Sequence, residues 1–560
     1  MRYLFITLLL SFGLTQILPA QDIERIAKAK PFQLSGFVRA NADYNETFDT
    51  TQAFEPFGYS LQASATVSIY GLSVPFSLTY RSNRFATGYR FPFNRYGLSP
   101  TFRWAKVHLG TRTMTFSPYT LAGRSFQGVG VELTPGKLRL SALRGRLENQ
   151  LTQLRNDEDL PIALPAYERH ILGVKAGIGS ANTFFDLMVV KVEDRGDLDL
   201  EEAALDSLFV MPRPEENMVL GSEFGITLFK AFSIKGSVAA SLHSGNTEAR
   251  SLELSGEDNE PIAEYLESQF SPNLSTRWGY AGQLSAQFNW PKIGFGVEYR
   301  RVDPFFISLG VFFLQQDVQN IRGNLRLNMF KNKLLINLSG GVEENNLAGF
   351  RAVTNRRVIG SANINYSPHR DFSLGFNLSN FRRDNQAGFV EVNDSLRSVN
   401  LSQSQSLSSR WRLGKGDRRI DLRFNAAYQT VTDLSMSQVG PTEFKVLNLG
   451  LSPGIQWESA GLRIGPTFRY TNTEGTMIEN RSMAAGLQMK KSLFGDSWSA
   501  QLRTTFRRLM TNEVTRNDWN WRGYIGGQLG RKVTLSLNLH YRQRQEARNL
   551  RSSLSITQRF

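Results

Sequence analysis

The chain has 560 residues and a formal net charge of +15, from 65 lysines and arginines against 50 aspartates and glutamates. Its 47 glycines, 39 phenylalanines and interleaved polar residues favour strands and turns over helices. It has no cysteine, which excludes disulfide bridges, thiolate metal sites, thiol nucleophiles and the acylated cysteine of a lipoprotein.

Residues 1–20 have the pattern of a secretory signal peptide. A positively charged start precedes a mostly apolar run, and a cleavage point follows Ala20. We therefore expect an exported protein, in which residues 21–31 form a short periplasmic segment and residues 32–560 form one domain. No other stretch reaches the roughly 18 apolar residues that a membrane helix needs.

Apolar and polar side chains alternate in long stretches after residue 32. In WGYAGQLSAQFNW, residues 278–290, the large apolar side chains share one parity, and glutamine, serine and asparagine share the other. This two-residue period is typical of a strand with one apolar and one hydrated face. Trp278 and Trp290 are twelve residues apart, roughly 40 Å along a strand, and therefore predict an aromatic girdle at each edge of a membrane.

The connections between these stretches alternate in length. Tight turns, such as TPGK at residues 134–137 and GRK at 530–532, alternate with longer polar loops, such as residues 44–57 and 246–275. This pattern predicts an all-β fold: a single transmembrane antiparallel β-barrel with short periplasmic turns and long extracellular loops. Counting gives about 26 strands, with 22–26 plausible, provided that a short strand lies within residues 111–120.

The chain ends on an alternating strand, SLSITQRF. We expect this strand to pair with the first one, near residues 32–44, because a closed barrel leaves no sheet edge unpaired in lipid. The terminal Phe560 resembles the assembly signal read by the outer-membrane insertion machinery. Gln558 departs from that pattern, in which an aromatic or apolar residue is usual.

Three segments go beyond general barrel character: IYGLSVPFSLTYRSN, FNRYGLSPTFRWAKVHLGTRTMTFSPYTLAGRSFQGVGVEL and TPGKLRLSALRGRL. Together, over residues 69–147, they resemble the N-terminal part of a group of large outer-membrane barrels common in Bacteroidota. The cut before Gln21 is similar to signal peptides of that phylum. The resemblance implies a Gram-negative outer membrane and a barrel fold, and it implies no particular activity.

No catalytic constellation is present. The sequence has no GxSxG, HExxH or GxxxxGK[ST], and its five histidines are scattered. His108 is the one candidate for an outer-membrane phospholipase, which needs a histidine and a serine together on the lipid-facing wall. Lys106 shares its parity, which favours an ordinary strand histidine instead. We therefore predict no enzyme, no cofactor and no metal site.

Basic residues share the inward parity on strands near the C-terminus. They are Arg463, Arg469, Arg503, Arg507, His540, Arg542 and Arg544. One interpretation is a cationic lumen wall that attracts anions. The other is a hydrated wall neutralised by neighbouring carboxylates, and the sequence does not choose between them. Two acidic loops, residues 193–217 and 255–270, are expected to fold into the basic lumen and narrow it.

The pattern favours a channel or transport protein for polar or anionic solutes in the cell outer membrane. The alternative is the barrel subunit of an envelope complex for assembly, secretion, or transport of lipids or macromolecules, with an envelope protein as partner. A TonB-dependent transporter is not expected unless a partner supplies its plug, because the segment before the first strand is too short for one. Expected contacts are outer-membrane lipid, lipopolysaccharide and the insertion machinery. Nucleic acid is not expected for an exported chain.

Overall fold

The computed structural model describes residues 31–48, 56–82, 95–151, 154–155, 161–163, 165–196, 198, 212–252, 270, 272–388, 397–414, 416–435, 442–476, 479–512, 514–545 and 547–560. The predicted signal peptide and residues 21–30 lie outside this part of the chain, as do most residues of the two acidic loops. Within it, no helix is long and apolar enough to cross a membrane.

The described secondary structure consists of β-strands, as the alternating side chains predict. The strands are β1 (Gln33–Thr47), β2 (Phe57–Ile69), β3 (Leu72–Arg81), β4 (Arg95–Leu98), β5 (Thr101–Phe102), β6 (Ala105–Thr113), β7 (Ser125–Leu133), β8 (Leu138–Glu148), β9 (Leu154–Arg155), β10 (Pro161–Ala163), β11 (Glu168–Gly179), β12 (Phe184–Arg195), β13 (Glu216–Leu228), β14 (Phe232–Ser244), β15 (Thr276–Asn289), β16 (Ile293–Val302), β17 (Val318–Met329), β18 (Leu334–Asn345), β19 (Val353–His369), β20 (Phe372–Ala387), β21 (Ser398–Leu413), β22 (Arg418–Asp433), β23 (Thr442–Trp457), β24 (Leu462–Gly475), β25 (Glu479–Leu493), β26 (Trp498–Thr511), β27 (Val514–Leu529), β28 (Val533–Arg544) and β29 (Ala547–Arg559).

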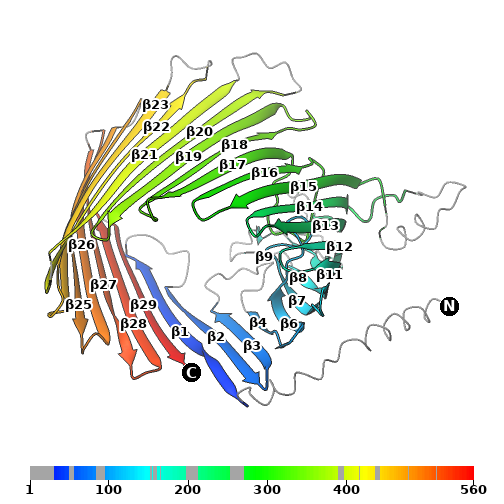
Figure 1. Ribbon diagram of the computed structural model, residues 1–560, viewed down its shortest axis with the longest axis horizontal. Helices are drawn as coiled ribbons and strands as arrows, with labels where there is room; N and C mark the ends of the chain where they lie inside the picture. Colours follow the sequence, from blue (N-terminus) through cyan, green and yellow to red (C-terminus); the bar gives the residue numbers. More distant parts are fainter. Residues whose placement is uncertain are drawn as a thin grey trace, which may run out of the picture.

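One antiparallel sheet closes on itself into a barrel (Figure 1). Its neighbouring strands follow one another along the chain, and β29 returns to pair with β1, with Phe37 opposite Arg559 and Thr47 opposite Asn549. The short strands β4 and β5 both lie between β3 and β6, so the 27 strands of this sheet fill 26 positions. The prediction of a barrel of about 26 strands, closed by the terminal strand, is confirmed.

The predicted strand within residues 111–120 is wrong. β6 ends at Thr113, and residues 114–124 turn into the barrel interior. The missing strand position is filled instead by β4 and β5, which a turn at residues 103–104 connects to β6. Pro100 has no N–H group and interrupts this strand position between β4 and β5. The alternation of side chains is therefore too short on either side to predict a strand.

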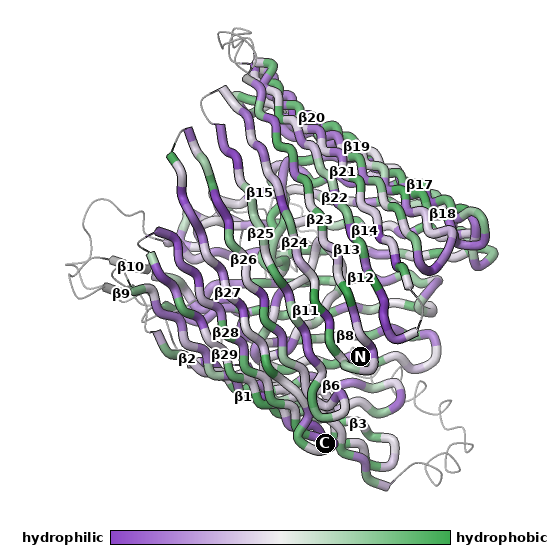
Figure 2. The backbone as a smooth tube through the Cα atoms, turned by 90° about the vertical axis from the view of Figure 1, so that its left-hand side faces the viewer, coloured by the Kyte–Doolittle hydropathy of each residue, from purple (hydrophilic) through white to green (hydrophobic). Residues whose placement is uncertain are grey.

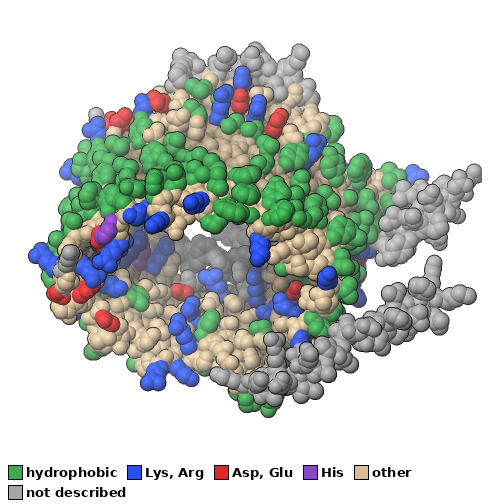
Figure 3. Space-filling model, viewed as in Figure 1, with side chains coloured by type: hydrophobic (Ala, Val, Ile, Leu, Met, Phe, Trp, Pro, Cys, Tyr) green, Lys and Arg blue, Asp and Glu red, His purple; other side chains and the backbone are tan. Residues whose placement is uncertain are grey.

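The outer face of the barrel is apolar. On β12, Leu187 and Val189 are exposed, whereas Met188 and Val190 are buried on the inner side. Hydropathy alternates in the same way along other strands (Figure 2), and apolar side chains cover much of the outside of the barrel (Figure 3). An exposed apolar surface of this extent is stable only in lipid, so the barrel spans a membrane.

The two ends of the barrel differ in their connections. We call the end with tight turns, such as residues 70–71, the turn end, and the opposite end the loop end. After β24, β26 and β28 the loop-end connections are also short, consisting of residues 476–478, 512–513 and 545–546. The predicted alternation of short and long connections therefore holds only as far as β23.

Two loop-end connections fold into the barrel interior. Residues 114–124, between β6 and β7, and residues 303–317, between β16 and β17, form what we call the inner layer. The two segments lie side by side, because Ala122 and Val311 form a parallel β-bridge and the Phe312 N–H donates to the Ala122 carbonyl at 3.0 Å. The inner layer therefore joins residues that are far apart in the sequence.

Buried apolar side chains hold the inner layer against the wall. One cluster joins Phe116 and Leu121 of the inner layer to Val190 of β12 and to neighbours on β7, β8 and β11. A second cluster joins Tyr119 and Phe306 to inward residues of β13–β17. Each such side chain contributes about 1.5–3 kcal/mol by leaving water, so the inner layer is a fixed part of the fold.

Glycines in the wall make room for the inner layer. A Cβ at Gly221 would lie 2.5 Å from Cγ2 of Thr120, and one at Gly279 would lie 2.4 Å from the backbone N of Phe306. A larger residue therefore fits at these positions only if the inner layer moves. Among the described residues, no comparable layer covers the inward faces of β20–β29.

Candidate functional site: the basic wall of the lumen

The inward faces of β22–β29 carry closely spaced arginines, and we call this surface the basic wall. On these strands Leu502 and Trp519 are exposed on the lipid side, whereas Arg503 and Asp518, one residue along, face the lumen. Basic side chains surround the central opening in Figure 3. Alternate residues of a strand point to opposite faces, so the parity of the sequence alone places these charges inside the barrel.

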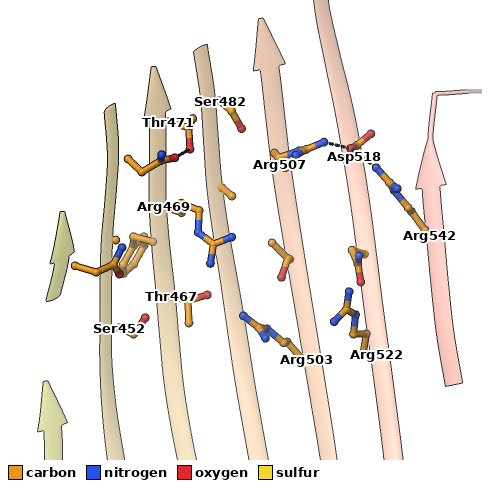
Figure 4. Close-up of a pocket in the computed structure, with 17 residues that line it drawn as sticks. Ser452, Thr467, Arg469, Thr471, Ser482, Arg503, Arg507, Asp518, Arg522 and Arg542 are labelled. Atoms are coloured by element: carbon orange, nitrogen blue, oxygen red, sulfur yellow. Dashed lines mark hydrogen bonds and ion pairs between the residues drawn. The ribbon is translucent and has the colours of Figure 1, made fainter. Parts of the chain in front are cut away.

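Near the loop end, three arginines share one carboxylate, Asp518, and Figure 4 shows two of them, Arg507 and Arg542, beside it. Asp518 of β27 accepts from Arg507 of β26 at 2.7 Å and from Arg542 of β28 at 3.2 Å, and the Arg544 guanidinium lies 3.7 Å away. Only 6% of Asp518 is exposed. Three positive charges therefore surround one negative charge, and the cluster keeps a formal excess of two.

Near the turn end, a second carboxylate has the same surroundings. Asp421 of β22 lies 3.2 Å from Arg410 of β21 and 3.2 Å from Arg463 of β24, and Arg412 lies 3.6 Å away. Asp421 is also buried. Both ends of the basic wall thus hold a carboxylate that neutralises only part of the adjacent arginine charge.

Between the two clusters, three exposed arginines have no anionic partner. Arg469 of β24, Arg503 of β26 and Arg522 of β27 form no hydrogen bond or ion pair with another residue in the part of the chain that the structure describes. They line a recess of about 590 Å³, together with uncharged polar groups (Figure 4). These groups are Asn425, Asn448, Ser452, Thr467, Thr471, Ser482, Thr505 and Asn520.

The seven basic residues predicted from the sequence lie on this wall, but not as one cluster. Three of them adjoin Asp518, namely Arg507, Arg542 and Arg544. Arg463 adjoins Asp421, and Arg469 and Arg503 lie between the two carboxylates. The seventh, His540, is paired with Arg522 across β27 and β28. Carboxylates neutralise part of the arginine charge and leave an excess, so the wall combines features of both sequence interpretations.

The predicted girdle tryptophans lie at opposite ends of β15. Trp278 lies near the loop end of the barrel and is 69% exposed. Trp290 directly follows β15 at the turn end and is 55% exposed. Phe560 follows β29, and its backbone exchanges hydrogen bonds of 3.1 and 3.2 Å with Gly36 of β1. The girdle and the assembly signal stay predictions.

His108 is not on the lipid-facing wall. It faces inward, where its Nδ1 lies 3.1 Å from Oγ of Ser99 and its Nε2 lies 2.6 Å from Oε1 of Glu132. These residue types resemble the serine, histidine and carboxylate of acyl-transfer enzymes. Ser99 is only 6% exposed and His108 only 3%, so a substrate does not reach this hydroxyl. The hydrogen bonds instead connect the end of β4 to β6 and β7.

The sequence interpretation missed the two carboxylates and the inner layer. Asp421 and Asp518 share the inward parity of nearby arginines, so their place on the wall follows from the sequence, whereas their contacts depend on the register between strands. The inner layer has a signal of its own in FFISLGVFFLQQ, residues 305–316. This stretch is too apolar for a hydrated loop and lacks the alternation of a strand.

No protein-family model matches the chain, and no curated protein matches it. Among solved structures, the P pilus usher (PapC) translocation pore is 10% identical, with a TM-score of 0.36 over 94% of this chain and 99% of that one. OccK8 (OprE) of Pseudomonas aeruginosa is 9% identical, with a TM-score of 0.32 over 62% of this chain and 93% of that one. OccAB4 of Acinetobacter baumannii is 9% identical, with a TM-score of 0.31 over 70% and 99%. Likenesses this weak carry no argument about what the chain does.

Proposed function

We propose that the chain is an outer-membrane channel for polar solutes that favours anions. One observation carries the proposal: Arg469, Arg503 and Arg522 line an open recess of the lumen without an anionic partner among the described residues. A unit charge at 4 Å attracts an anion by about 1 kcal/mol in water, and by more where the wall excludes water. Rings of arginine and lysine select anions in other pores for this reason.

The inner layer supports a solute path along the basic wall. It covers the inward faces of β7, β8 and β11–β17, whereas no such layer among the described residues covers β20–β29, so we place the solute path beside β20–β29. The tight turns favour a periplasmic turn end and an extracellular loop end. An entering anion would then meet the cluster around Asp518, the three unpaired arginines and the cluster around Asp421. At the two ends, the carboxylates neutralise part of the arginine charge and so weaken the attraction on the anion. The anion can then leave, because conduction needs binding that is weak enough to reverse.

Single-channel recording of variants in planar bilayers tests this proposal. Under a KCl gradient, we expect the wild type to reverse near the chloride potential, and the R469Q/R503Q/R522Q variant to reverse much closer to zero. Arg508 provides a matched control, because it lies on the outer face beside Met483 and Phe506. R508Q removes a charge without changing the lumen and should keep the wild-type selectivity. Equal selectivity in the wild type and the triple variant would contradict the proposal.

A further inference from the structure

One row of inward side chains crosses four strands and contains only basic residues. Arg503 of β26 lies directly opposite Arg522 of β27, Arg522 lies opposite His540 of β28, and His540 lies opposite Arg551 of β29. Figure 4 shows Arg503 and Arg522 on neighbouring strands, apart from the ion pair of Arg507 with Asp518. We call these four residues the basic row.

The basic row is electrostatically unfavourable as it stands. Like charges directly opposite each other on neighbouring strands destabilise a sheet. Asp518 lies on the same face of β27 but is shared by three other arginines. Arg551 donates to Oδ1 of Asn45 at 2.9 Å, whereas Arg503 and Arg522 have no partner within the described residues. A bound anion would relieve the repulsion between these two guanidinium groups.

The basic row borders a recess of about 740 Å³ with a distinctive lining. No carboxylate belongs to this lining in the described part of the chain. Its basic groups are Lys490, Arg503, Arg522 and His540, and its neutral polar groups are Gln488, Ser499, Gln501, Tyr524 and Asn538. The neutral groups can both donate and accept hydrogen bonds, so the recess offers charge for an anion and partners for hydroxyl groups.

We propose that this recess binds a dianionic oxyanion, either phosphate or a phosphate monoester. The inference rests on the proposed channel function for its place in a solute path, and it names the class of solute. Arg503 and Arg522 each present a planar fork of N–H donors, and their opposite positions on paired strands place both forks on the same face of the wall. A tetrahedral phosphate has enough oxygens to accept from both forks, whereas chloride offers no such geometry. The neutral lining matches the hydroxyls of an esterified polyol.

The test measures how inorganic phosphate changes the chloride current through the reconstituted protein at pH 8. Phosphate should reduce the wild-type current, and R503Q/R522Q should weaken this effect on the order of 100-fold. R503K/R522K keeps both charges but loses the forks, so it should weaken the effect about tenfold while chloride selectivity remains. R508Q should match the wild type. An equal phosphate effect in the wild type and R503Q/R522Q would overturn the site.

The two sources of a phosphate group are separated by a second probe. If glycerol phosphate reduces the current at lower concentrations than inorganic phosphate does, the recess recognises monoesters. If the two act equally, it recognises phosphate itself. In both cases the effect must be lost in R503Q/R522Q.

Calorimetric titration of the purified protein with inorganic phosphate separates this inference from the channel proposal. Phosphate binding that is lost in R503Q/R522Q, without any channel current, would keep the site and refute the channel. A chloride-selective current without phosphate binding would keep the channel and refute the site. Both substitutions remove charge from a repelling pair, so the variant should fold like the wild type. If it does not, R522Q alone takes its place.

Discussion

Replacing Asn217 by alanine should loosen the inner layer. Asn217 of β13 is 1% exposed, and it connects residues 303–317 to the wall. Its Nδ2 donates to the Ile307 carbonyl at 3.0 Å, and its Oδ1 accepts from the Leu309 N–H at 3.0 Å. In the variant, the hydroxyl of Ser241 still donates to the Ile307 carbonyl, but the Leu309 N–H loses its partner.

The size of this effect follows from the two contacts. A buried N–H without a partner costs about 1–3 kcal/mol, and the lost bond to the Ile307 carbonyl adds about 1 kcal/mol. The inner layer therefore loses about 2–4 kcal/mol of attachment. Because about 1.4 kcal/mol changes a population tenfold, its detached state should become roughly thirtyfold or more populated.

Hydrogen exchange followed by mass spectrometry measures this population directly. Backbone amides within residues 303–317, including the Phe312 N–H that donates to Ala122, should exchange faster in N217A, while the strands far from the inner layer keep their rates. Asn377 of β20 provides the matched control, because it is exposed on the lumen wall away from the inner layer and contacts Ser406 at 3.3 Å. N377A should leave the exchange unchanged. Unchanged exchange in N217A would refute the proposed attachment.

Three further changes test the same architecture. The chain has no native cysteine, so Ala122→Cys combined with Val311→Cys introduces only these two thiols. They should form a disulfide, because residues paired in a β-bridge lie within disulfide reach. Two free thiols would show that residues 114–124 and 303–317 do not lie side by side. Asn41→Cys combined with Ser555→Cys should crosslink the first and last strands, and an uncrosslinked product would argue against closure in this register. Gly221→Val should displace the inner layer and raise the single-channel conductance, because its Cβ would lie 2.5 Å from Cγ2 of Thr120. A conductance equal to that of the wild type would contradict this packing.

The barrel could be predicted because each strand carries its own signal. Residues 278–290 alternate over their full length, since one face of the strand meets lipid and the other meets water. Closure followed from the same physics, because an unpaired terminal strand is unstable in lipid. The one wrong strand, within residues 111–120, shows the limit of this reasoning. The alternation there reflects packing inside the barrel, and Pro100 interrupts the strand that takes its place.

The functional site could be predicted only as far as the face of each strand. Parity placed Arg503 and Arg507 inside the barrel, but the ion pair of Arg507 with Asp518 depends on the register of β26 against β27. That register is a property of the pair of strands, so neither strand shows it alone. The inner layer depends on the contact between Ala122 and Val311, which belong to different connections. A pattern read along the chain does not contain such a contact.

The reversal potential of the wild-type protein in a planar bilayer tests the central claim most directly. With an about tenfold KCl gradient across the bilayer, the unpaired arginines of the basic wall predict a stable open state whose reversal potential lies close to that of chloride. A barrel that stays closed, or an open state that passes potassium as readily as chloride, would contradict an anion-favouring channel.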